Sequence, residues 1–166
     1  DLKIEDFTLT EDSQKVNLLH ADLASGEPIN LVLLLDTSGT MAGAGITAAK
    51  AAASNFIAGL AANDRVAIIT FDSSIKTILD FTTDHTAARN ELLLVDATRG
   101  AGTCMYDAAY QAVQMTATVP SGRRAVILFT DGVDETPSGG ICSAHTPEDV
   151  INLAREGGTR APIYTL

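Results

Sequence analysis

The chain has 166 residues, of which 46% are hydrophobic and 19% are charged, values typical of one folded globular domain rather than of a disordered chain. Eleven basic and twenty-one acidic residues give a formal net charge of −10. Such a charge repels phosphate backbones and anionic lipid headgroups, so no nucleic acid is expected as a partner. The most apolar run, residues 30–35, is far shorter than the roughly 20 residues that span a bilayer, so we expect no direct membrane insertion.

Residues 1–29 fall outside the pattern of the rest of the chain. The segments DFTLTED and KVNLLHADL predict two strands joined by a polar turn. We therefore expect residues 1–29 to form an N-terminal β segment or the edge of an upstream β domain.

Residues 30–166 alternate short apolar runs with helix-like stretches, a pattern typical of a parallel sheet with helices on both faces. It predicts strands at residues 30–36, 65–72, 124–131 and 161–166, and helices at residues 46–62, 86–95, 106–118 and 147–156. A two-residue link before the apolar run 75–81 favours a hairpin with an antiparallel edge strand. The predicted fold class is α/β, with a doubly wound, Rossmann-like, mostly parallel sheet. Because the chain stops within the last predicted strand, we expect this domain to be truncated at its C-terminal end.

The most informative motif is DTSGT at residues 36–40, directly after the first central strand. Open α/β sheets bind their ligands at this carboxyl edge. Asp36, Ser38 and Thr40 offer hard oxygen ligands at alternate positions, which suit Mg²⁺, Mn²⁺ or Ca²⁺. Thr103 in a Gly-rich loop and Asp131 in the FTDG strand end offer more oxygens at the same edge. The sequence thus predicts one divalent cation on three loops.

These motifs, DTSGT, GAGTCMYDA and FTDG, resemble the metal-ion-dependent adhesion site of von Willebrand factor A domains, whose pattern is Asp-x-Ser-x-Ser, then Thr, then Asp. The resemblance covers residues 30–166, and the preceding DFTLTED is similar to the β segment of bacterial members. It implies a Mg²⁺ ion, with Mn²⁺ or Ca²⁺ as alternatives, held directly by Ser38, Thr40 and Thr103 and partly through water by Asp36 and Asp131. Thr40 replaces the usual Ser but keeps the hydroxyl, so we expect binding to survive.

The resemblance also implies a function, which is binding rather than catalysis. We expect a cation-dependent adhesion or assembly module that binds a protein partner through an Asp or Glu of that partner. The chief alternative is a structural module in which the metal only stabilises the loops. Taken alone, the DTSGT motif would also fit an ordinary capped turn between a strand and a helix.

Two enzyme or cofactor classes are less consistent with the sequence. Haloacid dehalogenase-like phosphotransferases have Asp-x-Asp-Gly-Thr after their first strand, and the second Asp is their general acid and base. Ser38 stands at that place, and a neutral hydroxyl cannot exchange a proton near neutral pH. Residues 43–48 match the dinucleotide fingerprint, but its first glycine should directly follow the strand, whereas the hydroxyl-rich motif intervenes here.

The two cysteines, Cys104 and Cys142, fit either a disulfide or two reduced thiols. A disulfide would tie two of the metal loops together and would imply an oxidising, extracellular or cell-surface location, whereas reduced thiols would permit a cytoplasmic one.

Three further polar groups are interpreted as structural. Asp134 and Glu135 are expected to be solvated, Asp107 to favour the start of a helix, and the three histidines to have surface or capping roles.

Overall fold

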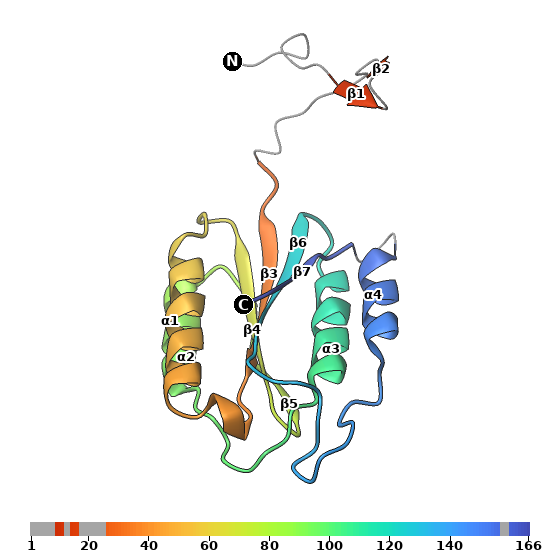
Figure 1. The fold of residues 1–166 in the computed structure, drawn as a ribbon. Helices are drawn as coiled ribbons and strands as arrows, with labels where there is room; N and C mark the ends of the chain where they lie inside the picture. Colours follow the sequence, from red (N-terminus) through yellow and green to blue (C-terminus); the bar gives the residue numbers. More distant parts are fainter. Residues whose placement is uncertain (1–8, 12–13, 17–25, 157–159) are drawn as a thin grey trace.

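The computed structural model describes residues 9–11, 14–16, 26–156 and 160–166 (Figure 1). Near the N-terminus, β1 (Leu9–Glu11) and β2 (Gln14–Val16) form an antiparallel pair. Two short strands are therefore present in the segment where two were predicted. The other residues of the predicted strands lie outside the described residues, and the assignment of residues 1–29 to a separate β segment stays a prediction.

A mixed five-stranded sheet with the order β5-β4-β3-β6-β7 forms the centre of the molecule (Figure 1). Its strands are β3 (Ile29–Asp36), β4 (Arg65–Phe71), β5 (Ile75–Thr82), β6 (Arg123–Phe129) and β7 (Ile163–Thr165). All neighbouring pairs are parallel except β4 and β5, which form the antiparallel hairpin at one edge. The predicted α/β fold class, including its antiparallel edge strand, is confirmed.

Helices cover both faces of the sheet, with α1 and α2 on one side and α3 and α4 on the other (Figure 1). Their bounds are α1 (Ala44–Ala58), α2 (His85–Leu94), α3 (Met105–Ala117) and α4 (Pro147–Arg155). Two buried apolar clusters fill the two layers, and they share the central strands because alternate residues point to opposite faces. This is why β3 and β4 are apolar along nearly their whole length.

The first helix differs most from its prediction, because α1 ends at Ala58 rather than at residue 62. Gly59 caps it, and a turn follows. The carboxylate of Asp64 stabilises this turn by accepting hydrogen bonds from the Ala61 N–H and the Ile29 N–H, both at 2.8 Å. The other predicted helices agree with the structure to within one residue. Among the described residues, none of the helices has the length and apolar character needed to cross a membrane.

Parallel pairing brings the loops of interest to one edge of the sheet. Asp36 is paired in register with Phe71, and Leu35 with Phe129, so β3, β4 and β6 end side by side. A short 3-10 helix, η2 (Gly39–Met41), turns the chain back after β3. Strand β6 ends at Phe129, two residues earlier than predicted, so residues 130 and 131 belong to the loop at this edge.

Candidate metal centre

Asp36 lies at the centre of the candidate site, at the carboxyl end of the middle strand. Its side chain is fully buried. One carboxylate oxygen, Oδ1, accepts a hydrogen bond from the Ser38 N–H at 2.8 Å, and Oδ2 accepts one from the Thr130 hydroxyl at 2.6 Å. The protein therefore fixes both oxygens of this carboxylate from two different loops.

The two hydroxyls of the DTSGT motif continue this network to the third strand. Ser38 Oγ and Thr40 Oγ1 lie 3.1 Å apart. Thr40 Oγ1 also donates a hydrogen bond to Asp131 Oδ1 at 2.9 Å, across 91 residues of sequence. Alternate spacing in the motif therefore places both hydroxyls on the same side of the turn, facing the loop that follows β6.

Thr103 joins the site from the loop before α3. Its backbone pairs with that of Glu135, with Thr103 N–H to Glu135 O at 2.8 Å and Glu135 N–H to Thr103 O at 3.1 Å. The preceding Gly102 is required here, because a side chain at that position would come within 2.5 Å of the Glu135 carbonyl oxygen. This close approach holds the Thr103 loop against the segment that follows Asp131.

Gly132 marks the point on which the three loops converge. A Cβ atom at Gly132 would lie 3.8 Å from Thr40 Oγ1 and from Thr103 Oγ1, and 3.9 Å from Asp36 Oδ2. Ser38 and Asp131 are both in hydrogen-bonding range of the same Thr40 hydroxyl. The structure therefore brings all five predicted residues together in one small region.

The chemistry of this set of oxygens fits a hard divalent cation. It consists of two carboxylates and three hydroxyls, without a thiolate or an imidazole, which is the type of donor set that Mg²⁺, Mn²⁺ and Ca²⁺ prefer. In the described part of the chain, no group of three or more His, Cys, Asp or Glu side chains is placed to hold an ion. A cation at this edge would therefore depend on the hydroxyls as well as on the carboxylates.

Thr130 also contacts the candidate site, although the sequence motifs did not predict it. Its hydroxyl donates to Asp36 Oδ2 and accepts a hydrogen bond from the Gly132 N–H at 3.2 Å. It thus orients the buried carboxylate and also shapes the loop of Asp131. Its position directly before Asp131 in the FTDG motif is the only sequence signal for this role.

A disulfide between Cys104 and Cys142 fixes the long loop after β6. The structure thus contains the bridge and not the two reduced thiols that the sequence also allowed. Cys104 follows Thr103 directly, and its N–H donates to the Asp72 carbonyl oxygen at 2.9 Å. The disulfide therefore joins the Thr103 loop covalently to the segment beyond Asp131.

Asp134 fixes the same loop from within, and the expectation that it is simply solvated is wrong. Its carboxylate accepts hydrogen bonds from the N–H groups of Tyr106, Cys142 and Ser143, and from the Ser143 hydroxyl. Burial raises the pKa of this carboxyl, but these hydrogen bonds outweigh burial and hold the pKa below its usual value. Asp134 is thus an ionised structural anchor at neutral pH.

Asp107 and His145 form a second anchor at the start of α3. Asp107 accepts hydrogen bonds from the N–H groups of Ala144 and His145, and it lies 2.7 Å from the His145 Nδ1 atom. The His145 ring stacks on Tyr110 with centroids 3.8 Å apart. Asp107 begins a helix as predicted, and it also holds the end of the loop that carries Asp131.

Comparison with known proteins gives one family match. Residues 31–133 match the von Willebrand factor type A domain family. This segment contains all five predicted site residues. No curated protein sequence matches the chain.

Solved structures with the same fold come from several bacteria. A von Willebrand factor type A protein from Catenulispora acidiphila has a TM-score of 0.66 at 23% identity, over 84% of this chain and 33% of that chain. The von Willebrand factor domain of the type V pili tip protein Mfa5 from Porphyromonas gingivalis has a TM-score of 0.58 at 22% identity, over 64% of this chain and 38% of that chain. The PilB minor pilin from Streptococcus sanguinis has a TM-score of 0.59 at 18% identity, over 69% of this chain and 32% of that chain. At these identities the similarity shows the fold alone.

The chain is shorter than the proteins that it resembles. It spans 19% of a structure with three N-terminal domains of Mfa5 and 38% of the structure of its von Willebrand factor domain.

We predict that the untreated protein takes up no thiol alkylating reagent and that two adducts appear after reduction, measured by intact mass. Replacing both cysteines by Ser should lower the free energy of unfolding by about 3–4 kcal/mol, because the disulfide closes a long loop in the unfolded chain. Ser138→Ala, in the same loop, serves as the control and should change it by less than about 0.5 kcal/mol. Two adducts on the untreated protein would contradict the bridge.

We predict that Asp107 makes stability depend on acid pH. Burial raises its pKa, but hydrogen bonds from Ala144 and His145 outweigh burial, so the folded-state pKa lies below 3.8. Its contribution is therefore complete above about pH 4 and is lost as the pH falls through the lower folded-state pKa. Urea unfolding should show Asp107→Asn to be about 1–3 kcal/mol less stable than the wild type at pH 7, with a smaller difference at pH 2.5. A difference that does not change with pH would show that the carboxylate charge is irrelevant.

Proposed function

Because the chain belongs to the von Willebrand factor type A domain family, we propose that it is a protein-binding module that works through one divalent cation. Asp36, Ser38, Thr40, Thr103 and Asp131 would hold the cation. The observation that carries the proposal is the convergence of these side chains from three loops around Gly132. We propose Mg²⁺ as the ion, with Mn²⁺ or Ca²⁺ as substitutes.

The arrangement of the carboxylates supports a binding role for the site. Both oxygens of Asp36 already accept hydrogen bonds from the protein, which supports a role for this residue through water. Ser38, Thr40 and Thr103 would then supply most direct contacts with neutral oxygens. A bound Mg²⁺ would supply one open position for an anionic oxygen of a partner. Catalysis is not part of the proposal, because the role proposed for the two carboxylates is to hold the cation.

The shape and the charges of the cleft beside the site also support a protein ligand. A cleft of about 350 Å³ runs beside Ser38, Thr40 and Thr103 towards Glu135 and Thr136. The exposed Arg99 lines the same cleft. The Arg99 guanidinium balances the Glu135 carboxylate that lines the same cleft, so the ion would supply the net attraction for an acidic side chain that enters there. This local charge would offset the repulsion between an acidic partner and a chain of net charge −10.

The similar structures and the disulfide support an extracellular or cell-surface location. Two of the solved structures are a type V pili tip protein and a minor pilin. The Cys104–Cys142 disulfide is a type of bond that persists in oxidising compartments. We therefore propose adhesion or assembly outside the cell as the setting of this module. A metal with a purely stabilising role is the alternative, and the effect of EDTA on partner binding separates the two.

We predict that titration calorimetry with Mn²⁺ shows one site, and that Asp36→Ala combined with Asp131→Ala abolishes the heat of binding. Thr130→Val keeps the shape of the side chain but removes its hydrogen bond to Asp36, so it should weaken binding about 10–100-fold. Asp80→Asn removes an exposed carboxylate on the edge strand β5 and should leave the isotherm unchanged. An unchanged isotherm in the double variant would refute the assigned site.

We predict that a random peptide library, selected on the protein in Mg²⁺, becomes enriched in peptides with Asp or Glu. EDTA and Thr103→Ala should each release these peptides. Arg99→Ala should weaken them about tenfold while leaving Mn²⁺ affinity intact, because it removes a charge that faces the cleft and not a metal ligand. Peptides retained equally with and without EDTA would show that the metal is structural, even if the calorimetric site is correct.

A further inference from the structure

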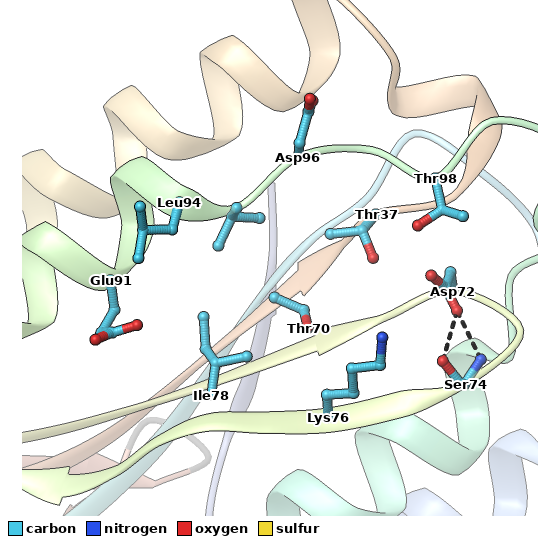
Figure 2. A pocket seen from close by; sticks show the side chains of 11 residues that line it. Thr37, Thr70, Asp72, Ser74, Lys76, Ile78, Glu91, Leu94, Asp96 and Thr98 are labelled. Carbon is cyan, nitrogen blue, oxygen red and sulfur yellow. Dashed lines mark hydrogen bonds between the residues drawn. The ribbon is translucent and has the colours of Figure 1, made fainter.

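The turn between β4 and β5 contains none of the five predicted metal residues, yet it lies against two of the three loops that carry them. It consists of Asp72, Ser73 and Ser74, between the end of β4 and the start of β5. Figure 2 shows this turn, with Thr37 and Thr98 on the facing side. Its contacts therefore bear on the geometry of a site to which it gives no ligand.

Two hydrogen bonds from the Thr103 loop end on this turn, one from the residue before Thr103 and one from the residue after it. The Gly102 N–H donates to the Ser73 hydroxyl at 2.8 Å. The Cys104 N–H donates to the Asp72 carbonyl oxygen at 2.9 Å. All three loop residues are buried, so water cannot readily replace an acceptor that is lost. The turn therefore holds the loop on both sides of Thr103.

The Thr103 backbone itself is held by a different segment. Its N–H and its carbonyl oxygen both pair with the backbone of Glu135. The Thr103 hydroxyl lies at the point where the three loops converge, 3.8 Å from the place of a Cβ atom at Gly132. A shift of the residues before and after Thr103 would therefore move this hydroxyl relative to the other candidate ligands.

The residue before the turn holds the DTSGT motif in the same way. The carbonyl oxygen of Phe71, the last residue of β4, accepts hydrogen bonds from the Thr37 N–H at 2.7 Å and from the Thr37 hydroxyl at 3.0 Å. Thr37 stands between the candidate ligands Asp36 and Ser38 in the sequence. Residues 71–73 thus contact both the DTSGT loop and the Thr103 loop, and they set the position of one loop relative to the other.

The turn is itself fixed by the buried carboxylate of Asp72. Its Oδ1 accepts hydrogen bonds from the N–H and the hydroxyl of Ser74 at 2.7 and 2.9 Å (Figure 2). Burial raises the pKa of Asp72, but these bonds, a hydrogen bond with the Thr98 side chain and the charge of Lys76 outweigh burial and hold the pKa below its usual value. Asp72 is thus ionised at neutral pH and stabilises the conformation of the turn.

From these contacts we infer that the β4–β5 turn positions Thr103 for the cation, with Ser73 as a positioning residue. Of the two bonds between the turn and the Thr103 loop, the one from Gly102 alone ends on a side chain, so a substitution can remove it. Ser73 does not line the cleft beside the site and acts through the Gly102 N–H. The inference rests on the proposed cation site.

The first test is the Mn²⁺ affinity of the full chain, measured by titration calorimetry. Ser73→Ala removes the acceptor of the Gly102 N–H and should weaken Mn²⁺ binding about tenfold. Ser73→Thr keeps the hydroxyl and should bind Mn²⁺ as the wild type does. Thr83→Ala removes an exposed hydroxyl just beyond the other end of β5 and should also leave the affinity unchanged. A residue that only stabilised the fold would lower the free energy of unfolding without changing the affinity.

The second test is backbone amide hydrogen exchange, measured by NMR in EDTA, which reports on the loop without the cation. The Thr103 and Cys104 amides bond to backbone carbonyl oxygens and not to the Ser73 side chain, so their exchange follows the position of the loop. Both amides should exchange about tenfold faster in Ser73→Ala than in the wild type or in Thr83→Ala.

The two tests separate this inference from the proposed function. A wild-type chain that binds no Mn²⁺ would refute the proposed function, and the exchange rates would then decide alone whether Ser73 positions the loop. If the wild type binds Mn²⁺, the inference is overturned when Ser73→Ala binds it equally well or when Ser73→Thr fails to restore the affinity. Unchanged exchange at both amides overturns it in either case.

Discussion

The buried carboxylate of Asp36 is the constraint on which the functional edge of this domain depends. A charge inside a protein is costly unless hydrogen bonds or a counterion compensate it. Here the Ser38 N–H compensates one oxygen and the Thr130 hydroxyl the other. These two bonds fix the turn after β3 and the turn after β6 relative to each other. The hydroxyls of the DTSGT motif are thereby held facing Asp131, and a divalent cation would complete the compensation.

The long segment after Asp131 has no regular structure until α4 begins, yet it is fixed by several independent contacts. The Asp134 carboxylate holds its two ends together, Asp107 holds its exit, and the disulfide joins it to the residue after Thr103. Backbone hydrogen bonds between Thr103 and Glu135 complete this arrangement. These contacts together set the position of Thr103 relative to Asp131. Among the helices, α3 takes part through its first residues, where Tyr106 bonds to Asp134 and Asp107 bonds to His145.

The order of the strands explains why polar residues from several loops gather at one edge of the sheet. Four of the five candidate residues lie at or after the ends of the neighbouring strands β3 and β6, and Thr103 joins them from the loop before α3. On the other side of β3, strand β4 turns into the antiparallel β5, and a cavity of about 200 Å³ lies between this hairpin and α2 (Figure 2). Between them, the Thr37 backbone contributes to both neighbourhoods, since it follows Asp36 and bonds to Thr98. Polar side chains can gather here because the apolar core ends where the strands end.

The sequence alone determined the fold class, and it predicted the five residues that the structure brings together at the candidate site. Apolar runs and helical periodicity report which faces are buried, and the DTSGT spacing places its oxygens on one side of a turn through local geometry. Contacts between distant loops leave no such local signal. The hydrogen bond from Thr130 to Asp36 spans 94 residues, the disulfide spans 38, and the hydrogen bond from Ile29 to Asp64 spans 35. The tertiary structure alone decided these features, because the residues of each contact are distant in sequence and lie side by side only in the folded sheet and its loops.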